Sequence, residues 1–196
     1  MNIINLTKDC EQIELSQFDL ITNFDCGDQD LNDFFNHTAI LYQNERLGKT
    51  FYYQYRQTEK VICAFSLSAD SVKTFLLSNN RRRKIKALLP YEKSLQSYPA
   101  ILIGRLGVSV DFGGQGIGSQ LIEIIKEFCQ SKFEHYARFL TVDAYNKPEV
   151  LKYYEKNDFE FLFLTEEDER NNLKKSINSD EPLNSRQMFF DLTRYE

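Results

Sequence analysis

A glycine-rich turn is the part of the sequence whose residue types and spacing most directly suggest chemistry. Residues 111–120 read DFGGQGIGSQ and stand between an apolar segment, Ala100–Val110, and a segment with helical periodicity. Glycine adopts positive φ without a Cβ clash, so successive backbone N–H groups can point into one concavity. The N-terminus of the following helix adds unpaired N–H donors and the positive end of its dipole. The turn therefore predicts a diphosphate site formed by Gly113, Gly114, Gln115, Gly116, Ile117, Gly118 and Ser119.

Two common phosphate-binding patterns do not match this turn. The nucleotide P-loop requires Lys and then Ser or Thr after its last glycine, whereas Gly118 is followed by Ser119 and Gln120. The dinucleotide pattern G-x-G-x-x-G, started at Gly114, needs a glycine where Ser119 stands. The alternative interpretation is a turn whose glycines only permit tight packing between strand and helix.

The turn resembles the phosphate-binding motif of the GNAT superfamily of acyl-CoA-dependent N-acetyltransferases, Arg/Gln-x-x-Gly-x-Gly/Ala. Gly116 and Gly118 match its two glycines, and Gly113 stands where the family has Arg or Gln. The resemblance implies that acetyl-CoA is the cosubstrate and that the backbone of the turn binds its pyrophosphate. It also implies that the backbone of Val108 and Val110 pairs with the pantetheine amides, much like a short extra strand.

The resemblance covers nearly the whole chain, from about Phe18 to Leu192. Within the superfamily, the sequence is similar to a branch that includes toxin-type enzymes, which acetylate the amino group of aminoacyl-tRNA. The segments that carry this likeness are Phe24–Gly27, Leu31-Asn32, Ser66–Ala69 and Ile103–Val108.

A second stretch, residues 146–159, resembles the family pattern Phe/Tyr-Tyr-Glu-Lys-x-Gly-Phe. The resemblance implies that Tyr154 is the general acid, that Tyr153 packs beside it, and that Asn146 hydrogen-bonds the pantetheine arm. A tyrosine hydroxyl, with a pKa of about 10, can protonate a departing thiolate of pKa about 8.5. Asp158 replaces the family's glycine, at a helix end where a left-handed residue is usual. The alternative for Tyr154 is a core tyrosine with a satisfied hydroxyl.

A general base and a covalent nucleophile are harder to find. Asp70 and Asp143 stand near predicted strand ends and could relay a proton through water, although such residues more often serve turns. Cys63 and Cys129 have no histidine placed to activate them, which favours direct attack by the amine without an acyl-enzyme.

The elements that must position these residues predict one mixed α/β domain over residues 1–196, built around one sheet. The resemblance implies the GNAT acyl-CoA N-acyltransferase fold, with a single central, mostly antiparallel sheet flanked by helices. A helix over Leu31–Tyr42 has Asp28 as its N-cap. Thr165–Arg186 is interpreted as a mobile loop in which a short helix can form, and Gln187–Leu192 as an edge strand. The remaining predicted elements are strands Thr50–Tyr55, Val61–Ala69, Ala100–Val110, Phe139–Ala144 and Phe159–Leu164 and helices over Leu121–Cys129 and Pro148–Asn157.

Composition limits the partners. Lys+Arg 24 against Asp+Glu 29 gives a net charge of −5, which argues against a general nucleic-acid binder. No apolar stretch is long enough to span a membrane and no leader pattern opens the chain, so we expect a cytoplasmic protein. His37 and His135 stand alone, so no metal is expected.

The function expected from these features is acetyl-CoA-dependent N-acetyl transfer to a primary amine, whose acceptor is a small molecule, a protein or aminoacyl-tRNA. The basic run Arg81–Lys86 is interpreted as a solvated surface, with a grip on a tRNA backbone as the alternative. A module that binds CoA without chemistry is a further alternative. Aromatic residues on the early strands leave open a homodimer interface, although core packing explains them as well.

Overall fold

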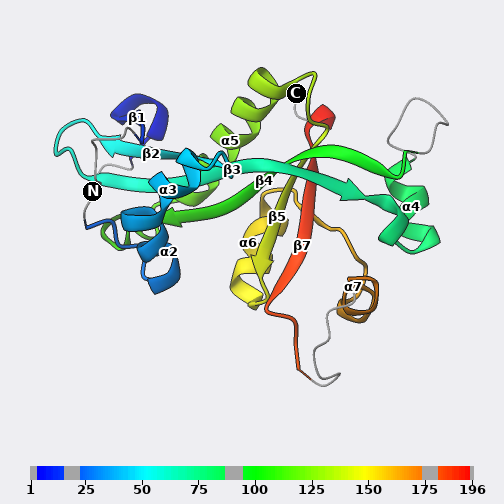
Figure 1. The fold of residues 1–196 in the computed structure, drawn as a ribbon. Helices are drawn as coiled ribbons and strands as arrows, with labels where there is room; N and C mark the ends of the chain where they lie inside the picture. The colour runs from blue at the N-terminus through cyan, green and yellow to red at the C-terminus, as the bar shows by residue number, and fades with distance from the viewer. Residues whose placement is uncertain (1–3, 16–22, 87–94, 174–180, 195–196) are drawn as a thin grey trace. The chain divides into compact units, whose positions relative to one another are not determined.

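The structure is a computed structural model, and it describes residues 4–15, 23–86, 95–173 and 181–194. Seven strands form one sheet, so the expected mixed α/β fold is confirmed. Figure 1 shows the sheet with helices beside it. The strands are β1 (Cys10–Glu14), β2 (Lys49–Tyr55), β3 (Val61–Lys73), β4 (Ser97–Val108), β5 (Phe139–Tyr145), β6 (Glu160–Phe161) and β7 (Ser185–Asp191). Their order across the sheet is β1-β2-β3-β4-β5-β7-β6. The pairs β1–β2, β2–β3, β5–β7 and β6–β7 are antiparallel.

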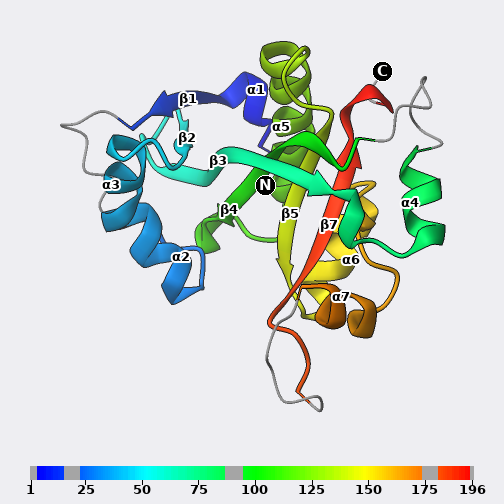
Figure 2. The ribbon, with the colours of Figure 1, turned by 45° about the vertical axis from the view of Figure 1, so that its right-hand side comes forward.

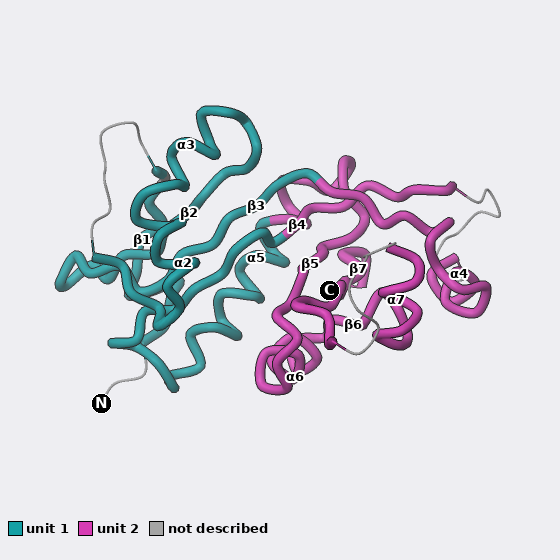
Figure 3. Tube along the Cα trace, turned by 60° about the horizontal axis from the view of Figure 1, so that its bottom comes forward, with its two compact units in different colours: residues 1–69, 103–128 teal, residues 70–102, 129–196 magenta. Residues whose placement is uncertain are grey.

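The chain divides into two compact units, coloured separately in Figure 3. Unit 1 contains residues 1–69 and 103–128, and unit 2 contains residues 70–102 and 129–196. The single domain over 1–196 stays a prediction. The helices are α1 (Leu6–Asp9), α2 (Gln29–Asp33), α3 (Ala39–Asn44), α4 (Asn79–Lys86), α5 (Ile117–Phe133), α6 (Pro148–Lys156) and α7 (Glu166–Asn172).

In unit 1 the first predicted helix is divided into three pieces. Asp28 caps α2, since its carboxylate accepts the Leu31 N–H at 3.1 Å, as the sequence predicts. A π-helical turn, Phe34–Thr38, then joins α2 to α3. Figure 2 shows this succession of turns beside the strands of the same unit. Phe34 and Phe35 of this segment are buried in one cluster with Tyr52 of β2 and Ala64 of β3.

Aromatic side chains build the core of unit 1. Phe24 and Tyr52 pack edge-on against the ring of Phe35, with centroids 5.4 and 6.1 Å away. Phe51 and Phe65 stack at 5.0 Å, and all five rings are at most 4% exposed. Because these five rings lie inside, core packing accounts for them, and the homodimer stays a prediction.

Helix α5 is anchored by one apolar stripe. Leu121, Ile122 and Ile125 recur at helical spacing and are fully buried. Burial of each such side chain contributes about 1.5–3 kcal/mol. At the start of the helix, the side-chain amide of Gln120 bonds the backbone of Ile4 and Leu6, both at 3.0 Å. The N-terminal end of α5 is therefore held in place.

Unit 2 corrects two sequence expectations. β7 is not an edge strand, because it lies between β5 and β6, and the predicted strand Phe159–Leu164 shrinks to β6, Glu160–Phe161. The segment interpreted as a mobile loop contains α7, although residues 174–180 lie outside the described residues. The order of the strands depends on pairing between segments that are far apart in the chain, and the local sequence pattern does not indicate it.

The basic run forms α4, and its charges have separate roles. Arg81 is 3% exposed, donates to the carbonyls of Leu162 and Phe161, and pairs with Glu160 at 3.3 Å. Arg82 donates to the carbonyls of residues 74, 75 and 77. Arg83 and Lys84 remain exposed. The expectation of a solvated surface is therefore wrong for Arg81, and the run offers a nucleic acid fewer free cations than its sequence suggests.

Candidate active site

The glycine turn in unit 1 has the backbone that the sequence predicts. Gly114 and Gly116 both have φ of +74°, in the left-handed region that favours glycine. A Cβ built at either position would meet nothing within 4 Å, so the space over the turn is open. A helix of 17 residues, α5, begins directly afterwards at Ile117.

The backbone amides of this turn have few internal partners. Gly113 donates weakly to Val110 at 3.4 Å, and the first helical bond runs from Gln120 to the carbonyl of Gly116. Among the described residues, no hydrogen bond is donated by the amides of Gly114, Gln115, Gly116, Ile117 or Ser119. The turn also carries no basic side chain, so its attraction for an anion comes from these N–H groups and the helix dipole.

The strand that leads into the turn differs from the prediction at its end. Val108 is the last residue of β4, and its pairing with the cofactor stays a prediction. Val110 lies beyond the strand, in a 3-10 turn, and its N–H already donates to the carbonyl of Asp25 at 2.9 Å. The expectation that Val110 extends the strand is therefore corrected, and its N–H is not free to bind a ligand.

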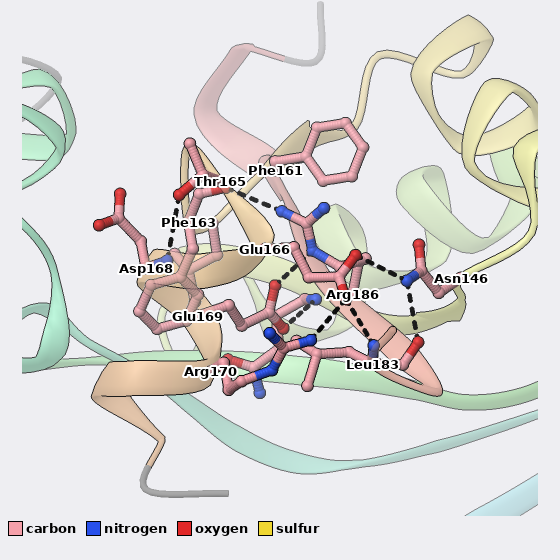
Figure 4. A network of polar contacts seen from close by, with 12 residues as sticks. Asn146, Phe161, Phe163, Thr165, Glu166, Asp168, Glu169, Arg170, Leu183 and Arg186 are labelled. Atoms are coloured by element: carbon pink, nitrogen blue, oxygen red, sulfur yellow. Dashed lines mark hydrogen bonds and ion pairs between the residues drawn. The ribbon is translucent and has the colours of Figure 1, made fainter. Parts of the chain in front are cut away.

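Asn146 belongs to unit 2 and follows β5 directly. Its backbone N–H donates to the carbonyl of Asn184 at 2.9 Å. Its side-chain Nδ2 donates to Glu166 Oε2 at 3.0 Å and to the carbonyl of Leu183 at 2.9 Å, as Figure 4 shows. These contacts use both hydrogens of the amide and leave Oδ1 as its remaining hydrogen-bonding atom.

Tyr154 lies in unit 2 on α6, whose end is closed by a Schellman motif. The Phe159 N–H bonds the Tyr154 carbonyl at 3.0 Å, and the Asp158 N–H bonds the Glu155 carbonyl at 3.0 Å. Asp158 has φ of +64°, so it adopts the left-handed conformation that the family's glycine would supply. The motif turns the Phe159 ring back to within 5.4 Å of the Tyr154 ring.

The Tyr154 side chain is enclosed but its hydroxyl is not satisfied internally. The residue is 7% exposed, with the Tyr153 ring 5.1 Å away on its other side. Within the described part of the chain the hydroxyl makes no hydrogen bond, unlike that of a satisfied core tyrosine. Burial raises the pKa of Tyr154 above its usual range, so the hydroxyl keeps its proton at neutral pH.

A pocket in unit 2 brings together two carboxylates that the sequence left in doubt. Asp70 and Asp143 both line it, together with Lys73, Gln187 and an apolar floor that includes Leu102. The Thr141 hydroxyl, also in the lining, donates to Asp70 Oδ2 at 2.5 Å.

Sequence reasoning missed Thr141 and Glu166 for different reasons. Thr141 and Asp143 are polar at alternating positions of the apolar segment FLTVDAY, a local signal that was available. Glu166 contacts Asn146 from 20 residues away, and nothing near it in the sequence indicates this.

Metal chemistry and covalent catalysis find no support among the described residues. In that part of the chain, no three His, Cys, Asp or Glu side chains are grouped to hold a metal ion. Cys63 and Cys129 are buried, and burial raises the pKa of Cys63 and takes that of Cys129 to about 12. In the same ranges, no helix combines the length and apolarity that crossing a membrane requires.

Solved structures similar to this chain include a bacterial toxin and complexes of AtaT. A mutant of KacT has a TM-score of 0.68 at 17% identity, covering 95% of this chain and 97% of that one. AtaT complexed with acetyl-methionyl-tRNAfMet has a TM-score of 0.68 at 19% identity, covering 95% and 96%. An AtaT mutant bound to the C-terminus of the antitoxin AtaR and acetyl-CoA has a TM-score of 0.63 at 17% identity, covering 95% of both chains. At these identities the likeness establishes the fold.

The family itself follows from the sequence model that matches the chain. The model of the acetyltransferase (GNAT) family matches residues 32–159, which is more than half of the chain. The match includes the glycine turn, Asn146, Tyr154 and the Schellman end of α6. The chain therefore belongs to the GNAT family of acetyltransferases.

Proposed function

We propose that the chain is an acetyl-CoA-dependent N-acetyltransferase that transfers acetyl to a primary amine by direct attack. The observation that carries the proposal is the glycine turn. Among the described residues, the amides of Gly114, Gln115 and Gly116 have no hydrogen-bond partner, and the long helix that follows suits a diphosphate. The diphosphate of acetyl-CoA would lie against residues 113–119. The complex of AtaT with AtaR and acetyl-CoA supports the same cosubstrate.

The chemistry requires one bond to form and one to break. The amine nitrogen attacks the thioester carbonyl carbon, the C–S bond breaks, and the thiolate takes a proton from the Tyr154 hydroxyl. The proton of the amine passes to a carboxylate, for which we propose Asp70, directly or through water. Exchange with solvent then restores both side chains. Tyr154 suits its role because it is protonated and because its hydroxyl has no hydrogen-bond partner among the described residues. Four of the similar structures are tyrosine-to-phenylalanine mutants, one of KacT and three of AtaT.

The direct test is thiol release from acetyl-CoA in the presence of a panel of primary amines. Acetylated product should appear in equal amount to free CoA. Calorimetry provides the separate measurement of acetyl-CoA binding, and a wild-type protein that binds none would exclude the function.

Gly116→Asp tests whether the turn holds the diphosphate. Aspartate tolerates a left-handed φ better than most residues, and its Cβ has open space, so the fold should survive. The added charge at an exposed site should raise the Kd for acetyl-CoA about tenfold, and less at high salt. Gly116→Asn is the control of equal shape without charge. Equal Kd values for the two variants would contradict the assignment.

Asp70→Asn tests the role of the unit 2 pocket. For an alkylamine, which is protonated at neutral pH, we expect kcat/KM to fall about 100-fold because the carboxylate no longer accepts the proton. The Kd for acetyl-CoA should not change. The same substitution at an exposed site, Asp30→Asn, is the control. Unchanged kcat/KM across pH 6–9 would remove Asp70 from the reaction.

Aminoacyl-tRNA is the second acceptor to consider. It is favoured by the fold shared with AtaT, whose complex contains acetyl-methionyl-tRNAfMet. The burial of Arg81 and the carbonyl contacts of Arg82 weaken the argument from the basic run. Acetylation of charged tRNA and arrest of translation in vitro would establish this acceptor, and failure of both would leave a small-molecule or protein amine.

A module without chemistry is the remaining alternative, and it rests on two departures from the family pattern. Asp158 no longer supports it, because the residue adopts the left-handed conformation required. Gly113 still supports it, because glycine lacks the side chain with which the family's Arg or Gln contacts the phosphates. Acetyl-CoA binding without transfer to any amine would favour this alternative.

A further inference from the structure

Helix α7 is fastened to β7 by a buried ion pair, seen in Figure 4. Glu169 is fully buried, and its carboxylate accepts Arg186 Nε at 2.7 Å and the Gln187 N–H at 2.9 Å. Arg186 is itself 8% exposed. At the start of the helix, the Thr165 hydroxyl caps the Asp168 N–H at 3.0 Å. The position of α7 on β7 is therefore set by the buried Glu169–Arg186 pair.

Glu166 lies one turn before Glu169 on α7 and uses both of its carboxylate oxygens. Oε1 accepts the Leu183 N–H at 2.5 Å and Arg170 Nη2 at 3.2 Å. Oε2 accepts Asn146 Nδ2 at 3.0 Å. The Leu183 N–H is the main cause that lowers the pKa of Glu166 below its usual value, and Asn146 adds to it. The carboxylate is therefore ionised at neutral pH and accepts hydrogen bonds on both sides.

The contacts around Asn146 allow only one orientation of its amide. Glu166 Oε2 and the Leu183 carbonyl are both acceptors, so both must face the NH₂ group. A rotation of the amide by 180° would place Oδ1 against two other oxygens. The side chain consequently presents its carbonyl oxygen, which can accept a hydrogen bond from a secondary-amide N–H.

We propose that Glu166 is a positioning residue for acetyl-CoA, which holds Asn146 so that Oδ1 accepts an N–H of the pantetheine arm. The inference rests on the proposed function, because it requires that Asn146 contacts the cosubstrate. It assigns a binding role to α7, a helix that lies beyond the end of the matched family model at residue 159.

A carboxylate is required at position 166, and an amide of the same shape cannot replace it. In Glu166→Gln one terminal atom becomes an NH₂ group. If that group faces Asn146 Nδ2, two donors oppose each other, and if it faces the Leu183 N–H, the same conflict arises there. Either orientation loses a hydrogen bond or rotates Asn146, so the orientation of Oδ1 is no longer fixed.

The experiment measures the Kd for acetyl-CoA and kcat with a saturating amine. Glu166→Gln should raise Kd about three- to tenfold, the effect of about one hydrogen bond, with kcat changed less than twofold. Glu167→Gln, an exposed neighbour on the same helix, is the matched control and should leave both values unchanged. In an Asn146→Ala background, Glu166→Gln should raise Kd by less than a further twofold. If Glu166→Gln raised Kd as much in the Asn146→Ala background as in the wild-type protein, the proposal would be overturned. An unchanged Kd in the single variant Glu166→Gln would overturn it as well.

A measurement on the wild-type protein covers the case in which Glu166→Gln does not fold. The side-chain amide of Asn146, identified in NMR spectra by its absence in Asn146→Ala, should exchange its hydrogens with solvent at least tenfold more slowly than exposed asparagines. Exchange at the exposed rate would also overturn the proposal. Failure of the wild-type protein to bind acetyl-CoA is a different result, and it would contradict the proposed function instead.

Discussion

Replacing Tyr154 by phenylalanine is expected to lower kcat about 100-fold or more, because a positioned general acid contributes 10²–10⁴ in rate. The substitution removes one oxygen and keeps the ring between Tyr153 and Phe159, at 5.1 and 5.4 Å. The packing and the Schellman end of α6 should therefore persist. The Kd for acetyl-CoA should remain within about twofold of the wild-type value, since the acid acts on the departing thiolate.

The control for this variant is Tyr153→Phe, the same change on the adjacent ring, which should leave kcat within about twofold. The pH profile supplies a second test. Burial raises the pKa of Tyr154, so the acid form persists as pH rises, and any loss of kcat caused by its ionisation should begin above pH of about 10. Equal losses of kcat and of acetyl-CoA affinity would remove the acid role.

Glu169→Ala should lower the free energy of unfolding by about 3–5 kcal/mol, because it leaves the Arg186 guanidinium buried without its partner. For a chain of this size the melting temperature should fall by about 10 °C. Glu167→Ala removes the same charge from an exposed position of α7 and should change stability by less than about 0.5 kcal/mol. Circular dichroism during thermal and urea unfolding measures both variants.

A second substitution separates the lost ion pair from simple damage to the helix. Arg186→Met combined with Glu169→Ala removes the stranded charge and keeps an apolar side chain near the Phe161 ring, which Arg186 contacts at 4.8 Å. The double variant should be more stable than Glu169→Ala alone, because apolar replacements of buried pairs are often near neutral. If the free energy of unfolding of Glu169→Ala falls by less than about 1 kcal/mol, the prediction that the buried ion pair holds α7 in place is contradicted.

The parts of the site that depend on near neighbours could be predicted from the sequence. The glycine turn, the helix that follows it and the Asp28 N-cap each rest on hydrogen bonds and backbone preferences within a few residues. The left-handed Asp158 belongs to the same group, because a helix end closes on its own last carbonyls. The family resemblance added the roles of Asn146 and Tyr154, which remain proposals.

What only the tertiary structure decided involves contacts between residues far apart in the chain. β7 lies inside the sheet because it pairs with both β5 and β6, whereas the sequence led us to expect an edge strand. Arg81 is buried because Glu160 and two carbonyls satisfy its charge from some 80 residues away. The orientation of Asn146 depends on Glu166 and Leu183, 20 and 37 residues later. Sequence periodicity reports which side of an element is apolar, but which partner satisfies a buried polar group is determined only when the elements pack.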